Sequence, residues 1–280
     1  MKSIFEVERR KDFETGYNRF VNALEETELT GLPDGADTMA EYMDYCIRYW
    51  PYRCGTDNIN DYLADINIDR SYIDTDEQRY IVLELYLNLL HWAPQQYIHD
   101  SQRTAFGSLN MSNEIADESK RLITNLEYIL EQCCNMRVRE ENGKGVEKYC
   151  ISKRDPIVDA TVVCVPELSS VLLGYLDIRN KNDISYKKRA LEVIYKYMEP
   201  HRNEYKGLIC QPVSEEFFAC MNSLGIRHNT ENQRAIPNAK RISVYDKLFE
   251  MALYVLQTKA TNQACKEMRL MRTDFESKAK

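Results

Sequence analysis

Apolar residues recur at spacings of three and four along most of this 280-residue chain, which is the period of a helix with one buried face. Residues 8 to 27, for example, place Phe13, Tyr17, Phe20 and Leu24 on one such face. The chain has only 10 Gly and 8 Pro residues, too few for the many tight turns of a β-sandwich or barrel. The pattern therefore predicts an all-α protein built from one or more multi-helix bundles.

Two capping boxes mark helix starts in the first part of the chain. They are Thr38-Met39-Ala40-Glu41 and Thr75-Asp76-Glu77-Gln78, in which a hydroxyl and a carboxylate or amide satisfy the first free backbone groups. After the second box, residues 80 to 92 are apolar on nearly every side, which predicts a central buried helix with His91 in the core. A further helix is expected from about residue 113 to residue 134.

A small β-hairpin is predicted at residues 135–153. Two short alternating runs flank the polar turn Glu140-Glu141-Asn142-Gly143-Lys144-Gly145. We interpret this hairpin as a connector between an acidic helical domain at residues 1–134 and a second helical domain at residues 154–280.

The second domain is again helical in pattern. Helix starts are expected near Pro166, at Ser185, at Ser214, where two glutamates follow, and at Ser243. In the helix after Ser185, the basic residues 187, 188, 189 and 196 are expected to lie largely off the apolar stripe. Beyond about Cys265 the sequence becomes polar, and we expect the last helix to fray there.

The cysteines do not form a recognisable metal-binding pattern. There are nine, an odd number, without a Cys-x-x-Cys, and the four histidines are not paired with them in spacing. We expect free thiols in a reducing compartment, and neither a metal site nor a cofactor. No apolar run is long enough for a membrane helix, and the first residues lack a signal-peptide core, so we expect a cytoplasmic protein that contacts no membrane.

Charge is divided unevenly along the sequence. Residues 1–178 contain 18 basic and 32 acidic side chains, a formal charge of −14, whereas residues 179–241 carry +5 and residues 242–280 carry +2. An acidic first part beside a basic second part argues against broad coating of nucleic acid. It leaves room for a local anion site in the second part and for a protein partner on the acidic part.

The segment from residue 214 to residue 241 contains the residues best suited to chemistry. It is expected to form a helix that ends at Leu224-Gly225 and is followed by Arg227, His228 and Asn229. Arg227 would pair with phosphate oxygens, and His228, whose usual pKa lies near neutrality, would act as base or acid. The structural alternative is that His228 caps the preceding helix and Arg227 forms an ion pair.

Four segments between about residues 146 and 258 carry a family resemblance. The segments are Tyr149-Cys150-Ile151, Met198-Glu199-Pro200-His201-Arg202, Met221-Asn222-Ser223-Leu224-Gly225-Ile226-Arg227-His228-Asn229 and Tyr245-Asp246-Lys247-Leu248-Phe249. Together they resemble poorly characterised bacterial helical proteins with an Asn-x-x-x-Ile-Arg-His-Asn signature, which we associate with HEPN-type domains of abortive-infection and toxin systems.

The resemblance implies an antiparallel helical bundle, a homodimer and, in some members, metal-independent RNA cleavage. Arg227 and His228 would then be catalytic, and Asn222 and Asn229 would orient the ribose or the imidazole. His201 and Arg202 would join Arg227 in binding the substrate anion. HEPN ribonucleases place several residues between this Arg and this His, whereas here the two are adjacent and would leave a helix about 100° apart.

Two hypotheses follow. In the first, the chain is a helical interaction or regulatory protein of a bacterial defence or toxin–antitoxin system. In the second, it is a metal-independent ribonuclease that binds RNA or a nucleotide and uses Arg227 and His228. Growth arrest that His228→Ala relieves would distinguish the second from the first.

Overall fold

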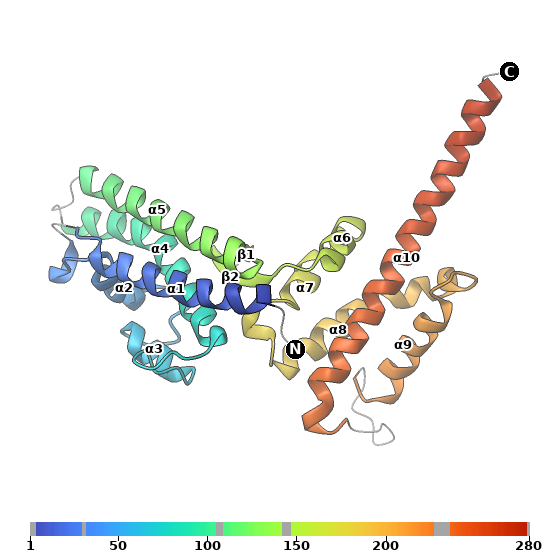
Figure 1. Ribbon diagram of the computed structural model, residues 1–280, viewed down its shortest axis with the longest axis horizontal. Helices are drawn as coiled ribbons and strands as arrows, with labels where there is room; N and C mark the ends of the chain where they lie inside the picture. Colours follow the sequence, from blue (N-terminus) through green and yellow to red (C-terminus); the bar gives the residue numbers. More distant parts are fainter. Residues whose placement is uncertain (1–3, 30–31, 105–108, 142–146, 227–235, 279–280) are drawn as a thin grey trace. The chain divides into compact units, whose positions relative to one another are not determined.

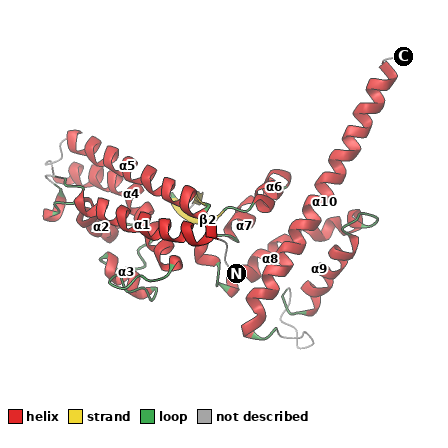
Figure 2. Ribbon diagram, in the orientation of Figure 1, coloured by secondary structure: helices red, strands yellow, loops and turns green. Residues whose placement is uncertain are grey.

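The computed structural model describes residues 4–29, 32–104, 109–141, 147–226 and 236–278. Contacts within the chain divide it into two compact units, Met1–Lys153 and Arg154–Lys280 (Figure 1). Across those described ranges the secondary structure is helical apart from one two-stranded antiparallel sheet and one isolated bridge (Figure 2). The predicted all-α fold with a single small hairpin is confirmed.

The first unit is built on three long helices that lie side by side, with two shorter helices beside them (Figure 1). Leu83, Leu85 and Leu87 on α4 are fully buried, so the predicted central helix of this unit is confirmed. It continues through Pro94. The helices are α1 (Ile4–Glu26), α2 (Met39–Cys46), α3 (Ile59–Asp65), α4 (Asp76–Thr104) and α5 (Leu109–Cys134).

Both predicted capping boxes are present. Thr38 Oγ1 accepts from the Glu41 amide at 3.2 Å, and Glu41 Oε2 accepts from the Thr38 amide at 3.3 Å. Thr75 and Gln78 exchange the same two bonds at 3.2 Å each. The sequence pattern did not reveal α3, because seven residues are too few to establish a helical period.

The hairpin consists of β1 (Met136–Glu141) and β2 (Lys148–Lys153), paired so that Val138 lies opposite Ile151. It packs against α4 and α5 within the first unit, and the division between units falls after it.

Two side chains of α4 hold the outer edge of β2. Asn88 Oδ1 accepts from the Tyr149 amide at 2.9 Å, and Asn88 Nδ2 donates to the Tyr149 carbonyl at 2.8 Å. One turn earlier, Glu84 Oε2 accepts from the Ile151 amide at 2.7 Å. Both side chains are almost completely buried, and they supply the hydrogen bonds that a third strand would otherwise make.

The second unit is a helical bundle organised around its last helix, α10, which contacts α6, α8 and α9 (Figure 1). Its core includes Tyr195, Phe217 and Phe218, all at most 1% exposed. The helices are α6 (Pro156–Cys164), α7 (Ser169–Gly174), α8 (Ile184–Met198), α9 (Gln211–Ser223) and α10 (Asn238–Lys278), with short 3₁₀ turns η3 (Pro166–Leu168), η4 (Ile178–Asn180) and η5 (Glu199–Tyr205).

Helix boundaries in this unit differ from the sequence prediction. Helix α9 begins at Gln211, so Ser214 is a buried residue within the helix and not its N-cap. Helix α10 begins at Asn238 rather than Ser243, and it stays helical to Lys278 where a frayed end was expected. Lys187 was also placed wrongly, because only 4% of its surface is exposed.

Candidate functional site

The end of α9 leads into the segment that the sequence analysis singled out. The Leu224 amide donates to the Cys220 carbonyl at 3.0 Å, and Gly225 takes a positive φ of 68° that favours glycine. The predicted end of the helix at Leu224-Gly225 is confirmed, and Ile226 beyond it is fully buried. The residues predicted to carry chemistry, Arg227, His228 and Asn229, lie outside the described residues.

Asn222 is on the last turn of α9 and takes part in the junction with α8. The hydroxyl of Tyr195 lies 3.4 Å from Asn222 Oδ1 and 2.8 Å from Glu199 Oε1. Since a hydroxyl has one proton to donate, the shorter contact with Glu199 is the stronger of the two. The Asn222 side chain thus lies at the junction of α8 and α9, where its contact with Tyr195 is the weaker one.

His201 and Arg202 are neighbours in η5, but their side chains reach different partners. His201 Nδ1 lies 2.7 Å from Glu204 Oε1. The guanidinium of Arg202 instead lies over the ring of Phe218, 4.9 Å from its centroid, which is cation–π geometry. Phe218 is one helical turn before Asn222 on α9, so the guanidinium of Arg202, which belongs to η5, lies against α9 one turn before Asn222.

A small charged cluster surrounds His201. The other oxygen of Glu204, Oε2, lies 2.9 Å from the ammonium of Lys259 on α10. The hydrogen bonds from Lys259 and then His201 hold the pKa of Glu204 below its usual value. The Glu204 carboxylate thus links η5 to α10, and the imidazole of His201 hydrogen-bonds to this same carboxylate.

A polar cluster that was not predicted lies at the edge of the core of the second unit. Lys187 Nζ lies 2.6 Å from Asp246 Oδ1, and the Tyr175 hydroxyl donates to the same oxygen at 3.0 Å. The ammonium also lies 4.1 Å from the centroid of the Tyr175 ring. Burial, followed by the nearby Asp246 carboxylate, raises the pKa of Tyr175 well above its usual value, so the hydroxyl stays protonated and donates.

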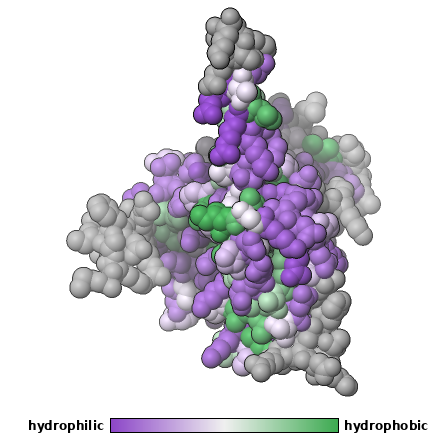
Figure 3. All heavy atoms as spheres, turned by 90° about the vertical axis from the view of Figure 1, so that its right-hand side faces the viewer, coloured by the Kyte–Doolittle hydropathy of each residue, from purple (hydrophilic) through white to green (hydrophobic). Residues whose placement is uncertain are grey.

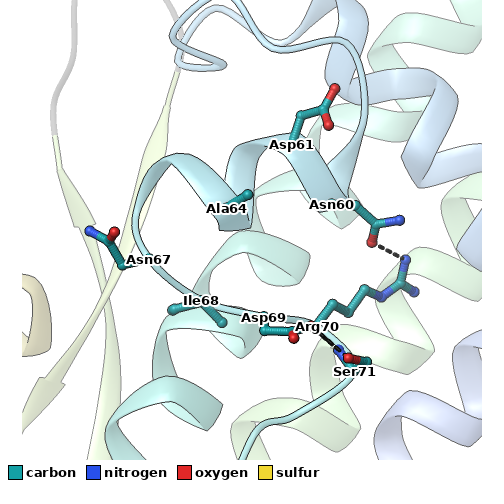
Figure 4. Close-up of a pocket in the computed structure, with 8 residues that line it drawn as sticks. All are labelled: Asn60, Asp61, Ala64, Asn67, Ile68, Asp69, Arg70 and Ser71. Atoms are coloured by element: carbon teal, nitrogen blue, oxygen red, sulfur yellow. Dashed lines mark hydrogen bonds between the residues drawn. The ribbon is translucent and has the colours of Figure 1, made fainter.

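An open depression in the first unit is lined by α3 and the loop that follows it (Figure 4). Its one cationic lining residue, Arg70, donates to Asn60 Oδ1 at 3.3 Å. Asp69 Oδ1 accepts from both the amide and the hydroxyl of Ser71, and these bonds lower the pKa of Asp69. These hydrogen bonds fix the loop internally and to α3. The Asp61 carboxylate points away from the guanidinium of Arg70 (Figure 4).

Metal-binding and membrane-spanning features were searched within the described ranges. No three His, Cys, Asp or Glu side chains gather there closely enough to hold a metal ion. None of the helices in the same ranges is both long and apolar enough to cross a membrane.

Comparison with known proteins gives no assignment: no family model, curated protein or solved structure matches this chain.

Proposed function

We propose that this chain is a helical interaction protein without catalytic activity, and that the end of α10 is its main contact element. The observation that supports this is the exposure of large apolar side chains there. Met268, Met271 and Phe275 are 64%, 55% and 69% exposed, and the view in Figure 3 shows hydrophobic side chains among hydrophilic ones on this projecting helix. Burying a large apolar side chain contributes about 1.5–3 kcal/mol, which a partner would recover.

The candidate site residues with a described position support the same proposal. His201 is used in the link to Glu204 and Lys259, and Arg202 lies on Phe218. Asn222 lies at the junction of α9 and α8, in contact with Tyr195. Each of these side chains has a structural task, which favours a scaffold over a substrate site.

The proposed partners are proteins. Residues 1–153 contain 17 basic and 28 acidic side chains, which would suit a basic protein surface. A second copy of the chain is the proposed partner of α10. We propose the setting in a bacterial defence or toxin–antitoxin system only on the basis of the resemblance around Asn222. In the alternative hypothesis, a metal-independent ribonuclease, the ligand is RNA or a nucleotide.

Expression in bacteria tests the absence of catalysis. We expect no growth arrest from the wild-type chain and no cleavage of a total-RNA substrate by the purified protein. Growth arrest relieved by His228→Ala, with an unchanged circular-dichroism spectrum and unfolding midpoint, would contradict the proposal and support the ribonuclease alternative. Arg227→Ala provides a second variant with the same expectation.

A photoreactive amino acid on α10 tests the contact directly. Placed at Met271 on the apolar stripe, it should give a covalent protein adduct in cells, whereas at Lys266, on the opposite side of the helix, it should not. Adducts at neither position, or at both equally, would overturn the assignment of this face as a protein contact.

A further inference from the structure

The apolar side chains at the end of α10 follow the spacing of a coiled coil. Ala264, Met268, Met271 and Phe275 are separated by four, three and four residues, so they form one stripe along the helix. Leu270 is 72% exposed but lies off this stripe.

This stripe continues only one border of the face that packs into the second unit, where Leu253, 4% exposed, lies five turns before Met271 on the same side of the helix. The core-facing residues include Leu248, Ala252 and Leu256, all at most 2% exposed. At about 100° per residue, the stripe is rotated by about 130° from them around the helix axis. The stripe's face touches α6 near Gln257, whose Nε2 donates to the Ile157 carbonyl at 2.8 Å. From Gln263 to Phe275 the side chains are exposed.

We propose that residues 261–278 of α10 form a parallel, in-register two-stranded coiled coil with a second copy of this chain. In the heptad that the stripe defines, Thr261, Met268 and Phe275 occupy the a positions, and Ala264, Met271 and, at the end of the helix, Lys278 the d positions. The inference rests on the proposed function, since it names the partner of the same face.

The charged residues beside the stripe favour a second copy of this helix as the partner, and they favour a parallel orientation of the two helices. Glu267 falls at a g position and Arg272 at the following e position, five residues later. In a parallel dimer g faces the partner's e, so two Glu267–Arg272 pairs of opposite charge form by symmetry. In an antiparallel dimer g faces g, and Glu267 would face the acidic Asp274 twice. The sequence of this helix is therefore complementary to itself in the parallel direction.

The composition of the stripe also predicts how tight the dimer is. Methionine, alanine, threonine and one phenylalanine fill its apolar layers in place of the branched aliphatic residues that favour stable dimers. Two and a half heptads form a short interface. We therefore expect reversible association whose extent rises with protein concentration.

The test measures the mass of the full-length protein in solution by sedimentation over a wide concentration range. Wild type should shift from monomer to dimer. Met271→Glu should remain monomeric, whereas the matched control Leu270→Glu should associate like wild type. Both variants should keep the wild-type unfolding midpoint of the monomer, which separates loss of the interface from loss of the fold.

Charge exchange then tests the direction. Glu267→Arg should weaken the dimer several-fold by facing Arg272 of the partner helix, and adding Arg272→Glu should restore it. Stronger association of the Glu267→Arg single variant would indicate the antiparallel arrangement and overturn the proposal. So would a wild-type protein that stays monomeric, or a dimer that Met271→Glu leaves intact. If the Met271 photoadduct contains a different protein, the coiled coil is wrong while α10 remains a contact element.

Discussion

Lys187 and Asp246 form an ion pair of unequal burial: the lysine side chain is 5% exposed, its carboxylate partner is 43% exposed, and their charged atoms lie 2.6 Å apart. The pair joins α8 to α10. Removing the exposed member leaves a buried cation, whereas removing the buried member leaves a carboxylate that water can reach. The two single substitutions should therefore differ in cost.

Asp246→Ala should lower the free energy of unfolding by about 2–3 kcal/mol, somewhat below the usual cost of breaking a fully buried pair because Asp246 is partly hydrated. Lys187→Met should cost less than about 1 kcal/mol, since methionine fills a similar volume. Urea unfolding of the two variants would check the order. Equal losses would indicate that the ammonium reaches water.

Asn88→Ala should loosen the attachment of the hairpin to α4 at Tyr149. It leaves the part-buried amide and carbonyl of Tyr149 without their side-chain partners, at a cost of about 2–3 kcal/mol. Hydrogen exchange of the Tyr149 amide should become faster by at least tenfold. Asn125→Ala on the exposed face of α5 is the matched control and should change the free energy of unfolding by less than about 0.5 kcal/mol.

Gly174→Ala should destabilise the second unit although alanine is the better helix former. A methyl group at this position would collide with the hydroxyl of Tyr186, which is the far end of a half-buried side chain, so the cost should lie near the lower end of the about 1–3 kcal/mol that overpacking causes. Combining it with Tyr186→Phe removes the colliding oxygen and should recover part of the loss. A double-mutant cycle from thermal unfolding measures this recovery, and strictly additive effects would contradict the predicted collision.

His91 should make stability depend on pH. Its ring stacks on Tyr149 with centroids 3.7 Å apart, and burial lowers its pKa while Glu147 partly opposes the shift. A lowered folded-state pKa means that the unfolded chain takes up the proton first. Stability should therefore be complete above the usual histidine pKa of about 6.5 and decrease as pH falls through it.

Titration of the ring by NMR and urea unfolding at several pH values, with His91→Phe as comparison, would test this. The variant should lose less stability than wild type between neutral and mildly acidic pH. A measured pKa above that of a free histidine would reverse the predicted dependence.

The elements that the sequence predicted correctly are those whose cause is local. A hydroxyl three residues before a carboxylate or amide fixed the starts at Thr38 and Thr75, and Gly225 marked the end of α9. The error at Lys187 came from a contact between distant residues. Lys187 carries a charge and was placed on the surface, yet Asp246, 59 residues later, makes its burial acceptable.

The candidate site shows the same limit. Sequence proximity grouped His201 with Arg202, but their side chains diverge in η5 toward Glu204 and Phe218. Glu204 follows His201 by three residues within η5, a spacing that helical pairing allows, whereas Phe218 lies on α9, which no spacing rule could identify. Ser214 followed by two glutamates looked like a helix start, whereas the helix had already begun three residues earlier.

The bonds from Glu84 and Asn88 to β2 have a consequence for how copies of this chain can meet. A bare strand edge recruits extended segments from other molecules and seeds fibrils. Here the amide of Ile151 and both main-chain groups of Tyr149 are already occupied by side chains from α4. Adding a foreign strand along that border would first require displacing them.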